Sequence, residues 1–205
     1  MIFAATTGIS AFPWYVIRVS GLLGVGLMGL LMLSGIGQVT GLTYRFIEPL
    51  KAWAIHKALA LGLVAVIAVH VLTLLIDSYM PFSLKQILVP FASGYTNKTT
   101  ILGVSLGSWG ITLGILAMYG LVIVVASSLG WIDSKKKAWH WLHYLSYFIM
   151  GAALVHALGV GTEFKDGSWR LLLLAGTGVV LLGVISRLVR AGSLRRRSVD
   201  EKDVQ

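Results

Sequence analysis

Residues 52–76 read AWAIHKALALGLVAVIAVHVLTLLI, an apolar run in which His56, Lys57 and His70 are the only side chains that can carry a charge. A membrane-spanning helix needs ~20 consecutive apolar residues, because the hydrocarbon layer is about 30 Å thick and each residue adds about 1.5 Å. The run is long enough to cross that layer. We therefore predict a transmembrane helix here, with two histidines inside it.

The rest of the chain has the same character. Of its 205 residues, 57% are hydrophobic and only 12% are charged, whereas a soluble domain carries roughly 25% charged residues. The sequence thus predicts an all-α integral membrane protein, a bundle of about five transmembrane helices. The expected spans are residues 14–37, 52–76, 103–130, 141–160 and 169–189. We expect one membrane domain over residues 1–190, followed by a basic and polar cytoplasmic tail over 191–205.

The basic residues predict the orientation of the bundle. With alternating spans, one side collects Arg45, Lys51, Lys57, Lys135, Lys136, Lys137, Arg187, Arg190, Arg195, Arg196, Arg197 and Lys202. The other side has Arg18, Lys85, Lys98, Lys165 and Arg170. Because cytoplasmic loops are enriched in Lys and Arg, we expect a multi-pass plasma-membrane protein with its N-terminus outside and its C-terminus inside. Basic residues placed beside apolar spans indicate contact with the lipid bilayer and no role in nucleic-acid binding. The long connection over residues 77–102 is too apolar for a solvated loop and is expected to form a re-entrant or surface-lying cap.

Four of the five histidines fall within predicted spans. His56 and His70 are 14 positions apart, and His143 and His156 are 13 positions apart in a later span. Ionisable residues inside a membrane helix are costly and usually functional. The chain has no cysteine, which excludes iron–sulfur clusters and covalently attached haem. His140 lies at the predicted interface and is interpreted as a surface histidine.

The spacing places one histidine near each membrane face. Fourteen residues of helix rise ~21 Å and thirteen ~19.5 Å. The two spans are expected to run in the same direction, so His56 is level with His143 and His70 with His156. Facing imidazoles at one depth are what a six-coordinate haem iron needs. The angular match is weaker, since 13 positions on an ideal helix end ~140° from the starting face. Structural hydrogen bonding, a zinc site and a proton relay remain alternatives.

These two histidine pairs resemble the ferric reductase-like transmembrane domain family, which includes the membrane halves of NADPH oxidases and ferric reductases. The resemblance covers about residues 52–189 and includes the run LIDSYMPF at residues 75–82. It implies two stacked, non-covalently bound b haems, the inner on His56 and His143 and the outer on His70 and His156. It also implies transmembrane electron transfer as an oxidoreductase component.

The resemblance suggests further residues and partners. Arg18 is the candidate cation for the outer haem, and Arg45, Lys51 and Lys57 are inner candidates. Because no dinucleotide-binding motif follows the last span, we expect a separate electron donor, either a flavoprotein or quinol. Ferric iron, oxygen or a partner reductase would accept electrons outside. A quinol-oxidising cytochrome b subunit and a haem-free membrane scaffold or transporter are the alternatives.

Glycines and large apolar side chains in the spans give weaker evidence for a bound cofactor. Glycines such as Gly21 and Gly114 allow close approach of another helix or of a flat cofactor. Phe148 and Met150 lie between the two histidine levels of their span. They are candidates for filling the space between two haems, although packing against lipid is the plainer expectation for each.

Overall fold

The computed structural model describes residues 7–78, 80–95, 100–101, 104–132, 134–165 and 167–203. Lys98, residue 79 of the LIDSYMPF run and residue 103, where the third span was expected to begin, lie outside these residues. In chain order the elements are α1 (Thr7–Val39), η1 (Thr43–Arg45), α2 (Pro49–Ile76), α3 (Leu84–Leu88), β1 (Thr100–Ile101), β2 (Val104–Ser105), α4 (Ser108–Gly130), α5 (Lys136–Val160), η2 (Thr162–Phe164) and α6 (Ser168–Asp203).

Five helices in the described part of the chain are long and apolar enough to cross a membrane, namely α1, α2, α4, α5 and α6. This confirms the predicted all-α architecture with five spans. The β1–β2 pair is a small antiparallel hairpin in which Thr100 pairs with Ser105. It adds a minor feature to one end of the helical bundle.

The helix boundaries differ from the predicted spans for local reasons. Helix α2 begins at Pro49, which suits the first helical position because proline has no N–H to leave unpaired. Helix α4 begins only at Ser108, because the preceding Gly107 has a φ of +46°, outside helical geometry. Helix α6 continues beyond the apolar part of its sequence to Asp203, so the predicted tail region begins as a continuation of the last helix.

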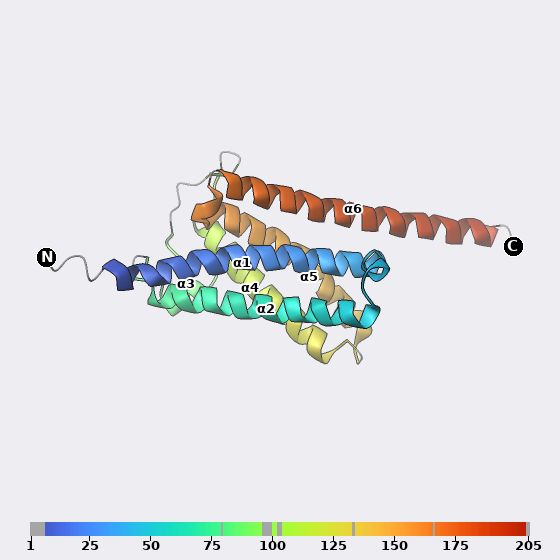
Figure 1. The fold of residues 1–205 in the computed structure, drawn as a ribbon, viewed down its shortest axis with the longest axis horizontal. Coiled ribbons are helices and arrows are strands. Elements are labelled where there is room, and N and C mark those ends of the chain that lie inside the picture. The colour runs from blue at the N-terminus through green and yellow to red at the C-terminus, as the bar shows by residue number, and fades with distance from the viewer. Residues whose placement is uncertain are drawn as a thin grey trace.

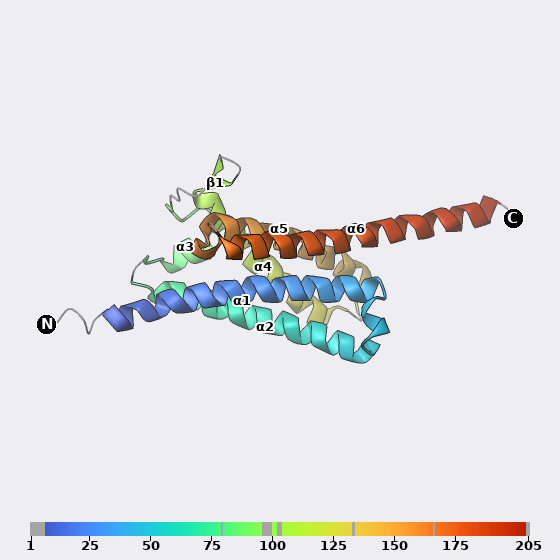
Figure 2. The same ribbon diagram turned by 45° about the horizontal axis from the view of Figure 1, so that its top comes forward.

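The long helices form two antiparallel hairpins, α1–α2 and α4–α5, with α6 packed along α1 (Figures 1 and 2). Helices α1, α4 and α6 run from the end that carries α3 and the β-hairpin, here called the cap end, to the opposite loop end. Helices α2 and α5 run in the other direction. The two helices that carry the histidine pairs are therefore parallel, as predicted from the alternation of spans.

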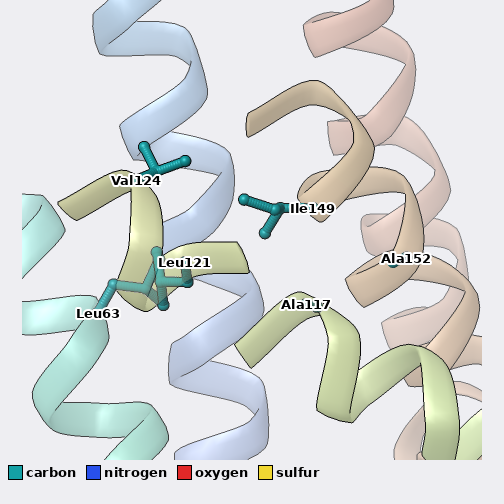
Figure 3. Close-up of a cluster of buried hydrophobic side chains, with 6 residues drawn as sticks. All are labelled: Leu63, Ala117, Leu121, Val124, Ile149 and Ala152. Carbon is teal, nitrogen blue, oxygen red and sulfur yellow. The ribbon is translucent and has the colours of Figure 1, made fainter. Parts of the chain in front are cut away.

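Figure 3 shows a cluster of buried apolar side chains in the middle of the chain's helical bundle. It consists of Leu63, Ala117, Leu121, Val124, Ile149 and Ala152, from α2, α4 and α5. Leu63 is fully buried and stands seven positions from each histidine of α2. On α5 it is Ile149 that fills this space. Phe148 is 56% exposed and faces outward, whereas Met150 packs in a separate cluster with α1 and α6.

The connection between α2 and α4 packs against the cap end through described contacts with α4. The Tyr119 hydroxyl donates to the Leu88 carbonyl at 2.6 Å, and the Phe91 N–H donates to Thr112 Oγ1 at 3.0 Å. Phe91 adopts a φ of +62°, a strained value for an aromatic residue. The hydrogen bond from its N–H to the buried Thr112 helps to hold this conformation.

Candidate functional site: two pairs of histidines

The pair at the loop end consists of His56 on α2 and His143 on α5. Their ring centroids are 6.3 Å apart, with the ring planes inclined by 48°. In the described part of the chain, both Nδ1 atoms are buried without a hydrogen-bond partner. Trp139 packs on the His143 ring at 5.0 Å, and its indole N–H donates to Ser128 Oγ at 3.0 Å. The two imidazoles thus face each other, and they form no hydrogen bond with each other through Nδ1.

The pair at the cap end consists of His70 on α2 and His156 on α5, two helices that run in the same direction. His70 Nδ1 is 3.1 Å from the Ile17 carbonyl and 3.1 Å from Ser20 Oγ. His156 Nδ1 is 2.8 Å from the Gly110 carbonyl. Because a carbonyl oxygen only accepts, each Nδ1 carries the proton, and each Nε2 keeps a free lone pair. Metal-bound histidines commonly have this arrangement, in which a backbone carbonyl fixes the tautomer.

Helix α5 is α-helical from Lys136 to Val160, so no local turn defect reconciles its two histidines. The two histidines therefore lie on different faces of α5 and have different neighbours. The His143 ring faces α2, whereas the His156 ring contacts α4 through Gly110. His140 is exposed, and its Nδ1 bonds the Lys136 carbonyl within the same helix at 2.7 Å, in agreement with its interpretation as a surface histidine.

Glycines on the neighbouring helices make room for three of the four rings. A Cβ at Gly21 or Gly35 of α1 would meet Cε1 of His70 at 3.5 Å or of His56 at 3.2 Å. A Cβ at Gly114 of α4 would lie 2.6 Å from Nδ1 of His156. Gly21 and Gly35 are spaced by 14 positions, as are the two histidines of α2, because the helices are antiparallel partners. Gly35 was not identified from the sequence. Its separation of 14 positions from Gly21, equal to that between His56 and His70, could have indicated it.

The geometry of the loop-end pair fits a haem iron. Two imidazole nitrogens on opposite faces of one metal are ~4 Å apart, which separates the ring centroids by roughly 6 Å. The observed 6.3 Å agrees with that value. The described residues contain no group of three or more His, Cys, Asp or Glu side chains arranged for a metal ion. Two imidazoles complete an iron centre when a porphyrin supplies the other four nitrogens, so the residues present fit haem.

Arg18 was predicted as the cation of the cap-end pair. At the cap end, Arg18 forms an ion pair with Glu163 of η2, and its guanidinium lies 4.0 Å from the centre of the Trp14 ring. Glu163 was not predicted, because on sequence alone it reads as a loop residue. Arg18 is on the helix that contacts His70 through Ile17, its neighbour in the chain.

The three predicted cations at the loop end are exposed in the structure. Arg45 is exposed, Lys51 pairs with Glu48 at the surface, and Lys57 lies over the Trp53 ring. The structure instead brings Arg187 of α6 to Tyr147, one turn of α5 from His143. From the sequence Arg187 was counted only among the basic residues that set the orientation.

The five long apolar helices define a multi-pass membrane protein, in which two parallel helices carry two histidines each. Residues 20–154 match the family model described as ferric reductase like transmembrane component. The chain therefore belongs to that family, as the resemblance indicated. The match includes His56, His70 and His143 and ends two positions before His156. No match was found among curated proteins or among solved structures.

Proposed function

We propose that this chain carries electrons across a membrane through two b haems, each held by one histidine of α2 and one of α5. His56 and His143 hold the haem at the loop end, and His70 and His156 hold the one at the cap end. The proposal rests chiefly on the facing rings of His56 and His143, on parallel helices that each carry a second histidine toward the cap end, in a chain of the ferric reductase-like family. Haem supplies reversible one-electron chemistry at each pair.

The residues of the chain account for the positioning that such a relay needs. The carbonyls of Ile17 and Gly110 orient the cap-end imidazoles, and Trp139 packs against His143 at the loop end. The apolar core around Leu63 excludes water between the two levels. Excluding water favours electron transfer along the bundle axis, because the reorganisation energy of the transfer is small in an apolar medium.

The direction of transfer follows from the distribution of charge. The loop end carries the larger share of Lys and Arg, so we propose that it faces the cytoplasm and that the cap end faces outward. Electrons then enter from a flavoprotein or quinol at the loop end. They leave at the cap end to ferric iron, oxygen or a partner reductase. In this proposal residues 1–190 form the membrane domain that holds the haems, and residues 191–205 form a basic cytoplasmic tail.

Spectroscopy of the purified protein tests the proposal. The detergent-solubilised chain should bind two haems, and its reduced-minus-oxidised spectrum should show the Soret shift of a b-type cytochrome. The His140→Ala variant is the matched control, because this exposed histidine should leave both haems in place. A wild-type protein without haem after reconstitution contradicts the proposal. Comparing reduction by a flavin reductase with NAD(P)H against reduction by quinol then identifies the class of donor.

A further inference from the structure

Arg187 on α6 is a half-buried cation that faces into the bundle. Its guanidinium donates a hydrogen bond to the Tyr147 hydroxyl on α5. The guanidinium carbon also lies 5.5 Å from the ring centre of Tyr144 and 5.7 Å from that of Tyr147. An arginine at the end of a membrane helix ordinarily extends toward water. Arg187 extends across to another helix instead.

The level of α6 relative to the loop-end pair follows from two close approaches. Gly35 of α1 lies against the His56 ring, and its neighbour Ile36 lies against Gly183 of α6. Gly183 is therefore level with the loop-end histidines. Arg187 is one helical turn beyond Gly183, about 6 Å closer to the loop end.

The hydrogen bond to Tyr147 shows how far the side chain returns toward the middle of the bundle. Tyr147 is one turn from His143 in the direction of the cap end, because α5 runs from the loop end to the cap end. A side chain that spans from Arg187 to Tyr147 brings its guanidinium to the level of His143.

A cation at this depth needs an anion, because the hydrocarbon region does not solvate charge. Among the described side chains the partners of Arg187 are two tyrosines, Tyr144 and Tyr147, and neither is an anion. Glu48, a carboxylate at the same end, pairs with Lys51 at the surface. The counter-ion is thus expected from a bound group. Haem b carries carboxylates, and an arginine fork suits a carboxylate better than a lysine does.

We infer that Arg187, held in place by Tyr147, binds a carboxylate of the haem that we propose for His56 and His143. This inference rests on the proposed function and adds α6 to the cofactor site. Arg187 and Tyr147 are cofactor-binding and positioning residues in this account, and the other helices supply the ligands. It also makes Arg187, rather than Arg45, Lys51 or Lys57, the cation of the loop-end site.

A redox titration of haem absorption in detergent tests the inference. The loop-end component is identified as the one lost in the double variant His56→Ala with His143→Ala. Removing a nearby cation disfavours the reduced iron centre, so Arg187→Gln should shift the equilibrium of this component about tenfold toward oxidation, or ~59 mV for one electron. The cap-end component should stay in place. Lys51→Gln removes an equal charge at the same end and should shift neither component.

Two further variants separate binding from folding. Arg187→Lys keeps the charge and should restore most of the potential, and Tyr147→Phe should shift the loop-end component in the same direction by less. These two variants decide the matter if Arg187→Gln loses both haems. An unmoved loop-end potential in Arg187→Gln, or an equal shift of both components, overturns the inference and leaves the proposed function standing. A wild-type chain without haem overturns both.

Discussion

The imidazole rings of His56 and His143 face each other across the bundle, with centroids 6.3 Å apart, from two helices that run in the same direction. The same two helices carry His70 and His156 toward the other end. Because α2 and α5 are parallel, ligands at equal depth pair, and diagonal pairing requires an offset of ~20 Å along the helix. The four histidines thus lie at two separate levels on one pair of helices.

Gly114 should be essential for the cap-end site. An alanine Cβ would lie 2.6 Å from His156 Nδ1 and would displace the ring from the Gly110 carbonyl. We expect Gly114→Ala to bind the cap-end haem roughly 10- to 100-fold more weakly, as is usual when the group that orients a metal-bound histidine is lost. Haem stoichiometry and a two-component titration measure the effect. Gly26→Ala is the control, because nothing lies within 4 Å of that position; equal haem loss in both variants would refute the role of Gly114.

Arg18 and Glu163 should move the cap-end potential in opposite directions. Removing the cation with Arg18→Gln should lower the potential, whereas Glu163→Gln should raise it by removing the paired anion. Each shift is expected to be about tenfold in the redox equilibrium or less, because both side chains are about a quarter exposed. Redox titration of both variants checks the signs. Shifts of the same sign would show that the pair acts through structure alone.

Among the leucines of α2, Leu63 should cause the largest loss of stability when it is replaced by alanine. It is fully buried between the histidine levels, so Leu63→Ala leaves a cavity and should destabilise the protein by about 2–5 kcal/mol. Leu72→Ala is the matched control on the same helix, because Leu72 is 62% exposed and faces lipid. Thermal unfolding in detergent, followed by haem release, compares the two. A similar melting temperature for both variants would mean that this core contributes little.

The number of spans and the level of the histidines could be predicted from the sequence, since both depend on length and direction alone. Apolar length gives the spans, and alternating spans make α2 and α5 parallel. The contacts between helices could not be predicted in the same way. Ile149 rather than Phe148 fills the core because rotation of α5 about its axis is fixed by packing against α4. From the sequence, Arg187 was interpreted only as one of the basic residues that set the membrane orientation. Its partner Tyr147 lies 40 positions away, so their contact could not be recognised.

The pairing of the four histidines is the central claim, and paired double variants test it most directly. His56→Ala with His143→Ala should remove one haem and leave about one per chain, with a single component in the redox titration that matches the cap-end haem. His56→Ala with His156→Ala should damage both sites and leave neither component intact. The measurement is haem stoichiometry together with the titration of each variant. If the His56 and His156 variant instead retains one haem with an unchanged potential, those two residues share a site, and the account of two level pairs is wrong.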